Sequence, residues 1–272
     1  MPTLLCETAE IYYEVHGQGA PLLLISGLGG GTWSWYGQIP YFRNYYRAIV
    51  FDNRGAGRSS MPPGPYRMDR FAHDALCLLD HLEVEKAFVL GLSMGGMIAQ
   101  ELTLLAPERV RALVLGCTHC GGEAQVPPDP EVVRKLLDND GLDHEGIIEK
   151  NLPLFLSREC IENRPEVARA YRAAQLAAPP QPDFAFKAQL AAVSGFDAST
   201  RLHQIGVPVM IVAGSHDVLI PRENAYILAG AMPGAQLAIL PGAGHALHAE
   251  CADTLNSIAD NFFQQFIPED ES

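Results

Sequence analysis

The chain has 272 residues and a mass of 29.5 kDa, with 48% hydrophobic and 19% charged residues. This size and balance predict a globular protein with one large domain or two small ones. The formal net charge is −13, from 19 Lys+Arg against 32 Asp+Glu, which argues against general binding to nucleic acids or to anionic membranes.

The first residues, Met1–Glu7, lack the basic and long apolar regions of a signal peptide. The longest apolar runs, such as 22–25 and 209–213, are too short to span a membrane. Six cysteines are scattered without a disulfide framework, so we expect reduced thiols and a cytoplasmic protein. Cys117 and Cys120 form a C-x-x-C pair, but no second ligand pair accompanies it, so we expect no metal or redox role.

Short apolar runs alternate with stretches of helical type along the chain. Residues 11–15 alternate like a half-exposed strand, whereas the later runs are continuous, which is typical of parallel strands buried on both faces. Helices are expected at 70–82, 97–105 and 222–231, and hence a doubly wound parallel sheet with helices on both faces. The continuous runs are 21–25, 46–51, 87–90, 112–116, 207–213 and 236–240.

The alternation stops between residues 118 and 203, where helical patches occur without a convincing strand. Because this stretch begins and ends within the sheet sequence, we expect a helical insertion that covers the sheet edge. The predicted core domain therefore comprises 1–117 and 204–272, and the helical cap is 118–203. The acidic end, 268–272, is expected to be frayed.

The segment Val89–Gly96 joins an apolar strand to a helix through the pattern Gly-x-Ser-x-Gly. A serine on such a sharp strand-to-helix turn presents its hydroxyl at the edge of the sheet. Gly91 and Gly95 leave room where the turn brings the two backbones together. Ser93 is therefore the predicted nucleophile.

Two later strand ends carry the partners that a serine nucleophile needs. Active groups gather at the carboxyl ends of the strands in an open parallel sheet. Asp217 and His245 follow the last two predicted strands, which gives the chain order Ser93, Asp217, His245. The histidine would take the serine proton and return it to the leaving group, while the aspartate would orient the imidazole. Glu123 as the acid and His248 as the base are alternatives.

The oxyanion that forms on an attacked carbonyl needs preorganised hydrogen-bond donors. One expected donor is the backbone N–H of Met94, the residue after the nucleophile. The second is the N–H of Leu28, in the glycine-rich loop 26–31 that follows a predicted strand. Asp52 and Arg54, at another strand end, are expected to brace loops through hydrogen bonds.

With these residues placed, the chain resembles an α/β-hydrolase-fold protein along nearly its whole length. It is most similar to the branch of small esterases, enol-lactonases, carbon–carbon hydrolases and haloperoxidase-like proteins. The resemblance implies an eight-stranded, mostly parallel sheet with a helical cap after the sixth strand. Many relatives have His-Gly at the oxyanion loop, whereas Ser26 precedes Gly27 here, a difference that leaves the backbone donor in place. The motifs are Ser26-Gly27-Leu28-Gly29, Phe51–Ser59, Gly91–Gly96, Gly214–Asp217 with Pro221, and Gly244-His245 with Glu250.

We expect a serine hydrolase that acts on a small carboxylic ester, a lactone or a related carbonyl compound through an acyl-enzyme. A small molecule is the expected partner and no cofactor or metal is expected, while a homo-oligomer stays open. The alternatives keep the triad for carbon–carbon hydrolysis, perhydrolysis or lyase chemistry, or make the chain a ligand-sensing protein. Trp33, Trp35, Phe155 and Phe184 are candidates for substrate contacts or, equally, for packing under the cap.

Overall fold

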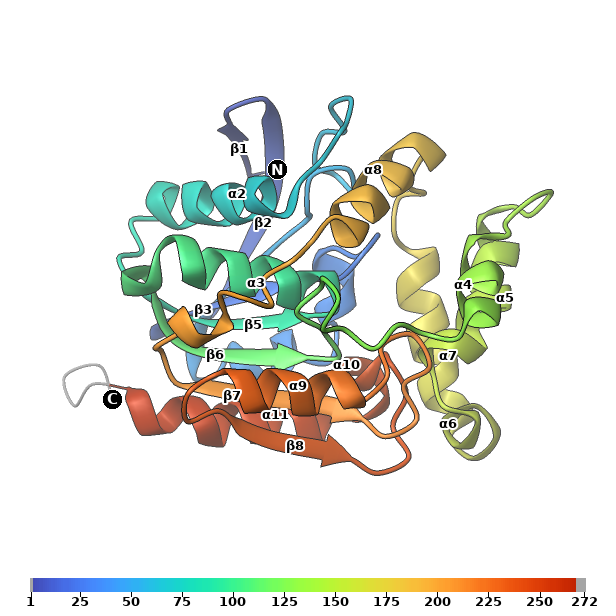
Figure 1. Ribbon diagram of the computed structural model, residues 1–272. Helices are drawn as coiled ribbons and strands as arrows, with labels where there is room; N and C mark the ends of the chain where they lie inside the picture. The colour runs from blue at the N-terminus through green and yellow to red at the C-terminus, as the bar shows by residue number, and fades with distance from the viewer. Residues whose placement is uncertain (1, 268–272) are drawn as a thin grey trace.

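A computed structural model of the protein describes residues 2–267. A single sheet in the order β1-β2-β4-β3-β5-β6-β7-β8 runs through the molecule (Figure 1). β2 pairs antiparallel with β1 and β4, and all the other pairs are parallel, which confirms the predicted sheet. The strands are β1 (Thr3–Cys6), β2 (Ala9–His16), β3 (Ala20–Ile25), β4 (Tyr46–Phe51), β5 (Ala87–Leu92), β6 (Val110–Gly116), β7 (Val209–Gly214) and β8 (Gln236–Leu240).

The continuous apolar runs form strands, and those in β3 to β7 are buried on both faces. β8 lies at an edge of the sheet and is mostly half-buried, so the expectation of burial on both faces is wrong for this strand. In β3, Leu23 and Ile25 belong to the apolar cluster on one side of the sheet, whereas Leu22 and Leu24 belong to the cluster on the other side. Alternate side chains of a strand point to opposite faces, so a strand between two helical layers needs apolar residues at every position.

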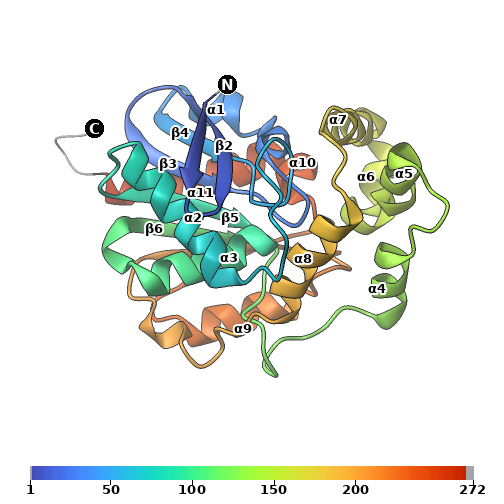
Figure 2. The same ribbon diagram turned by 90° about the horizontal axis from the view of Figure 1, so that it is seen from above.

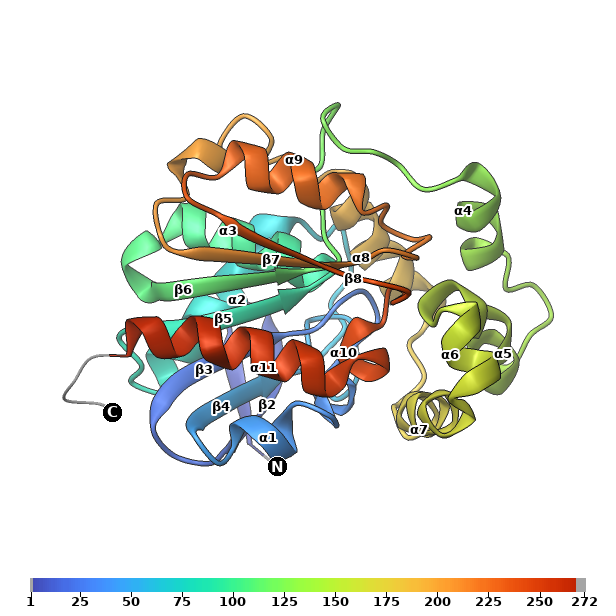
Figure 3. The ribbon, with the colours of Figure 1, turned by 90° about the horizontal axis from the view of Figure 1, so that it is seen from below.

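Helices cover both faces of the sheet. Figure 2 shows the layer of α2 and α3, and Figure 3 shows α11 across the opposite face. The first layer is α2 (Met68–His81), α3 (Met94–Leu105) and α9 (Glu223–Ala231), and the second is α1 (Ile39–Phe42) and α11 (Ala252–Phe263). Shorter elements are η1 (Thr32–Trp35), η2 (Pro107–Arg109), η3 (Leu202–Gln204), η4 (Gln264–Phe266) and α10 (Leu247–Glu250).

Five α-helices lie between β6 and β7 in the chain. α4 to α7 lie beyond the carboxyl ends of the strands (Figure 1), whereas α8 joins the main core through Ala188 and Ala192. Side chains of Asp129, Asp143 and Ser157 cap the first turns of α4, α5 and α6. The division into a core and an insertion at 118–203 stays a prediction. The bounds are α4 (Pro130–Leu137), α5 (His144–Phe155), α6 (Arg158–Asn163), α7 (Pro165–Leu176) and α8 (Asp183–Ser194).

The sequence did not reveal β1. This strand has only four residues, and Leu5 is 67% exposed, so its apolar run is too short to mark it. The acidic end at 268–272 lies outside the described residues. Within residues 2–267, none of the helices has the length and apolar character needed to cross a membrane.

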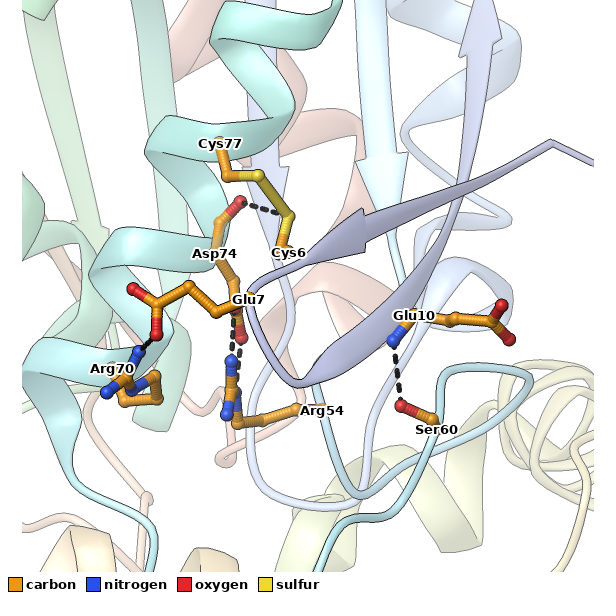
Figure 4. Close-up of a disulfide and its surroundings, with 8 residues drawn as sticks. All are labelled: Cys6, Glu7, Glu10, Arg54, Ser60, Arg70, Asp74 and Cys77. Carbon is orange, nitrogen blue, oxygen red and sulfur yellow. Dashed lines mark hydrogen bonds and ion pairs between the residues drawn. A yellow bond between two sulfur atoms is a disulfide. The ribbon is translucent and has the colours of Figure 1, made fainter.

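The prediction that all six cysteines are reduced is wrong for one pair. Cys6, the last residue of β1, and Cys77 in α2 form a disulfide (Figure 4). The two residues are 71 positions apart in sequence, and the packing of β1 against α2 brings their Cα atoms to 6.1 Å. Spacing alone carries no trace of this contact. The free cysteines are Cys117, Cys120, Cys160 and Cys251.

Removing this disulfide is expected to lower the free energy of unfolding by about 4 kcal/mol, because a long closed loop restricts the unfolded chain. Chemical denaturation of the wild type and of Cys6→Ser, with Cys251→Ser as the matched control for a free cysteine, measures the effect. Equal unfolding free energies for the wild type and Cys6→Ser would contradict the assignment.

Candidate active site

Ser93 occupies a sharp turn between β5 and α3. Its backbone has φ 55° and ψ −122°, a strained conformation for a residue with a side chain. Every residue from 87 to 100 is buried except Ser93. The turn therefore brings one partly exposed hydroxyl to the carboxyl end of β5, as in a nucleophile elbow.

Glycines allow this turn to stand against the neighbouring strand. A Cβ at Gly95 would overlap the carbonyl oxygen of Ile25, at the end of β3, and a Cβ at Gly91 would overlap the carbonyl oxygen of Gly95. A Cβ at Gly27 would lie 3.1 Å from the Cβ of Ser93. The absence of side chains thus lets the loop after β3 approach the hydroxyl.

His245 and Asp217 form a buried pair at the ends of β8 and β7. His245 Nδ1 lies 2.8 Å from Asp217 Oδ2. The other carboxylate oxygen, Oδ1, accepts hydrogen bonds from the N–H groups of Leu219 and Ile220, both at 2.9 Å. These bonds fix the carboxylate, which in turn holds the proton on Nδ1 and leaves Nε2 for proton transfer.

The alternatives Glu123 and His248 lie outside this pair. Glu123 is exposed. His248 lies in α10, where its ring centroid is 6.0 Å from that of Trp35 and 6.4 Å from that of Tyr171. The structure thus brings Asp217, and not Glu123, to His245.

Two backbone donors near Ser93 are those of Leu28, in the loop after β3, and of Met94, the first residue of α3. The N–H of Gly30 donates to the carbonyl of Gly27 at 3.0 Å, which closes a tight turn. The N–H of Gly29 donates to Gln189 Oε1 at 2.9 Å. No described residue accepts a hydrogen bond from the N–H of Leu28 or of Met94. These two groups are therefore available to a ligand oxygen.

Residues after β4 hold both ends of this loop. Asn53 Nδ2 donates to the carbonyl oxygen of Ser26 at 2.9 Å and lies 3.4 Å from its Oγ. Asp52 Oδ1 accepts a hydrogen bond from the N–H of Thr32 at 2.7 Å. Ser26 is buried, so its hydroxyl takes part in the packing of this loop.

The four candidates for substrate contact lie in different surroundings. The ring of Phe155, in α5, is 5.7 Å from that of His245, measured between centroids. Trp35 is 0% exposed in the core, and Trp33 packs on glycines of the loops after β3 and β4. Phe184, in α8, is 53% exposed. Phe155 is thus the candidate that lies beside the His245–Asp217 pair.

Cys117 is a neighbour of this pair that the sequence analysis did not place there. Its Sγ and ligand atoms of Asp217 and His245 all lie within 4.8 Å of one another, the one grouping of possible metal ligands found in residues 2–267. Burial and the Asp217 carboxylate raise the pKa of the Cys117 thiol, which keeps it protonated. Its position directly after β6, between two strands that carry candidate residues, is the signal that could have revealed it.

His119 is a second imidazole near the site. The N–H of Gly121 donates to His119 Nδ1 at 3.0 Å, so the neutral ring carries its proton on Nε2. Burial and, secondly, the nearby His245 lower the pKa of His119 to about 4. His119 is therefore neutral at pH 7.

This lowered pKa makes the unfolding free energy depend on pH. Between an unfolded-state pKa of 6.5 and a folded-state pKa of about 4, the unfolded chain binds the proton and the folded protein does not. The contribution of His119 to the free energy of unfolding is therefore fully present above pH 6.5 and falls by about 2 to 3 kcal/mol toward pH 4.5. Denaturation curves at pH 7 and 4.5 measure how much unfolding free energy each protein loses between the two pH values. The loss should be smaller by that amount in His119→Asn than in the wild type, whereas equal losses would contradict the assignment.

Several known proteins are similar to this chain in sequence or in structure. The profile of the α/β-hydrolase fold family matches residues 20–251. The chain is 33% identical over 256 residues to a protein named as the carbamate hydrolase RutD of Azorhizobium caulinodans, covering 93% of this chain and 95% of that protein. It is 29% identical over 269 residues to 3-oxoadipate enol-lactonase 2 of Acinetobacter baylyi, covering 97% of each. The solved structure of Est816, described as an N-acyl homoserine lactone degrading enzyme, is similar with a TM-score of 0.83 and 29% identity, covering 96% of this chain and 100% of that one.

Proposed function

The chain belongs to the α/β-hydrolase fold family and is a hydrolase of that fold, and we propose that Ser93, His245 and Asp217 are its catalytic triad. The observation that carries this proposal is the buried 2.8 Å pair of His245 and Asp217 at the sheet edge that also carries the partly exposed Ser93. A buried carboxylate behind an imidazole is the arrangement that activates a serine hydroxyl.

In the proposed reaction, Ser93 Oγ attacks the carbonyl carbon of the substrate while His245 Nε2 takes the hydroxyl proton. The carbonyl oxygen becomes an oxyanion that accepts hydrogen bonds from the N–H groups of Leu28 and Met94. Collapse of this intermediate breaks the bond to the leaving oxygen, which receives the proton from Nε2, and an acyl-enzyme forms. Water then attacks the acyl-enzyme with His245 as its base, which releases the carboxylic acid and restores Ser93.

We propose a small carboxylic ester or lactone as the substrate. The names of the enol-lactonase and of Est816 support a lactone, and the apolar ring of Phe155 beside His245 supports an apolar group near the reacting carbonyl. A carbamate is the second candidate, supported by the likeness to RutD. The cytoplasmic location and a homo-oligomer stay predictions, and the Cys6–Cys77 disulfide weighs against a reducing compartment.

A substrate panel tests this proposal. We expect measurable kcat/KM for short-chain p-nitrophenyl esters or for acyl homoserine lactones, and its loss in Ser93→Ala. A carbamate turned over more than tenfold faster than every ester and lactone would favour the second candidate. Absence of turnover, or turnover that persists in Ser93→Ala, would contradict the proposed function.

A further inference from the structure

Gln189, in α8, joins three segments that are far apart in sequence. Its side chain is 0% exposed, and both ends of the amide form hydrogen bonds. Oε1 accepts from the N–H of Gly29 at 2.9 Å, and Nε2 donates to the carbonyl of Arg54 at 2.8 Å. One side chain of α8 therefore contacts the loop after β3 and the loop after β4. Figure 2 shows α8 against the core, apart from α5, α6 and α7.

The neighbours of Gln189 fix the orientation of its amide. Gln181 Nε2 donates to Gln189 Oε1 at 3.0 Å and to the carbonyl of Gly55 at 2.6 Å. A reversed amide would set N–H groups against the N–H of Gly29 and an oxygen against the carbonyl of Arg54, so the arrangement is unambiguous.

Arg54, whose carbonyl accepts the hydrogen bond from Gln189 Nε2, is itself held by its side chain. The side chain of Arg54 is buried and forms two hydrogen bonds to the carboxylate of Asp74 in α2, each at 2.5 Å (Figure 4). A buried pair with two matched contacts restricts both partners. Gln189 is thus attached to a rigid part of the core.

Gly29 follows Leu28, the proposed oxyanion donor, and both peptide units that flank Leu28 are held. The first, between Gly27 and Leu28, is fixed because its carbonyl accepts from the N–H of Gly30 at 3.0 Å. The second, between Leu28 and Gly29, is fixed because its N–H donates to Gln189. Peptide units are planar, so the first contact sets the direction of the Leu28 N–H. The second contact holds the central peptide of the turn that the Gly27–Gly30 hydrogen bond closes. Gly29 has φ +69°, and a glycine there leaves the loop flexible without such a contact.

We infer that Gln189 is a positioning residue that holds the oxyanion loop, an inference that rests on the proposed function. The insertion between β6 and β7 thereby helps to fix the catalytic geometry, in addition to placing Phe155 beside His245. Without Gln189 the Leu28–Gly29 peptide rotates more freely, which loosens the turn whose Gly27–Gly30 hydrogen bond orients the Leu28 N–H. The effect falls on the chemical step, because the oxyanion is absent from the bound substrate and develops in the transition state that leads to the tetrahedral intermediate.

Gln189→Met keeps the size of the side chain and removes its three hydrogen bonds, to Gly29, Gln181 and Arg54. We expect kcat to fall about 10- to 100-fold with KM within about threefold of the wild type, because the oxyanion donor is misplaced but present. The inhibition constant of an aryl boronic acid, which mimics the tetrahedral intermediate, should rise in proportion. Gln38→Met is the matched control, since Gln38 is also 0% exposed and bonds to the carbonyl of His248 and to Asn256. The control should keep kcat within about twofold.

Gln189→Glu supplies a test that loss of packing does not imitate. The carboxylate keeps an acceptor for the N–H of Gly29 but repels the carbonyl of Arg54, whereas the protonated acid donates to that carbonyl and restores both contacts. The ratio of its kcat to that of the wild type should therefore rise several-fold as the pH falls from 8.5 to 6. A constant ratio would contradict the inference.

Hydrogen exchange at the Gly29 amide, followed by NMR, tests the contact independently of turnover. Gly29 should be protected in the wild type and in Gln38→Met and should exchange about tenfold faster or more in Gln189→Met, because its acceptor is gone. A wild type without Ser93-dependent turnover but with this Gly29 pattern would refute the proposed function and keep the role of Gln189 in holding the loop. A folded Gln189→Met with unchanged Gly29 exchange, or with kcat within twofold of an active wild type, overturns the inference.

Discussion

Ser93→Ala is expected to lower kcat for esters and lactones about 10⁵- to 10⁶-fold and to leave KM and the melting temperature nearly unchanged. The hydroxyl is the one partly exposed side chain in the buried stretch from 87 to 100, so its removal deletes the attacking atom without opening the core. The remaining turnover comes from substrate binding and the oxyanion donors, which do not depend on the hydroxyl. Steady-state kinetics with matched melting curves measures both quantities.

Ser194→Ala is the control for this change, because Ser194 is exposed at the end of α8. The control should keep full activity. A folded Ser93→Ala protein that retains more than about a hundredth of the wild-type kcat would show that another group attacks the substrate.

Asp217→Asn is expected to lower kcat about 10⁴-fold while the fold persists. The N–H groups of Leu219 and Ile220 now donate to Oδ1, and in the variant they select the amide oxygen for that place. The amide NH₂ then faces His245 Nδ1 and donates to it. This forces the imidazole proton onto Nε2, the atom that has to accept the proton of Ser93. The wrong tautomer therefore blocks the first step.

Asp197→Asn provides the matched control, because Asp197 is an exposed aspartate that hydrogen-bonds to Ser199 outside the site. It should retain normal kinetics. A loss of less than tenfold in Asp217→Asn would contradict the role of Asp217, and loss of activity in Glu123→Gln would then transfer that role to Glu123.

The fold and the candidate triad could be predicted because local features determine them. The apolar runs mark β3 to β8 directly. In the inner strands β3 to β7 the side chains of each run alternate between two helical layers. Gly91 and Gly95 mark the turn at Ser93 because neither position has room for a side chain. A Cβ at Gly95 would overlap Ile25, and one at Gly91 would overlap Gly95. Asp217 and His245 each follow a strand closely, so their places at the carboxyl edge follow from the parallel sheet.

Other features depend on contacts between distant segments, and the sequence carries no local mark of them. Cys6 and Cys77 are 71 residues apart, and Gln189 and Gly29 are 160 residues apart. An alternation of strands and helices does not say which face of α8 meets the loop after β3. The sequence does not separate the candidates for substrate contact for the same reason: Trp35 and Phe155 are equally apolar, but Trp35 lies in the core and Phe155 lies beside His245.

We propose above that Ser93 is an activated nucleophile. The most direct measurement is reaction of the native protein with a fluorophosphonate, followed by peptide mass spectrometry of the wild type and of Ser93→Ala. An activated serine attacks the phosphorus and expels fluoride, so we predict one adduct, on the peptide that contains Ser93, and none in the variant. Native protein that stays unlabelled at Ser93, or an adduct that persists in Ser93→Ala, would contradict the account.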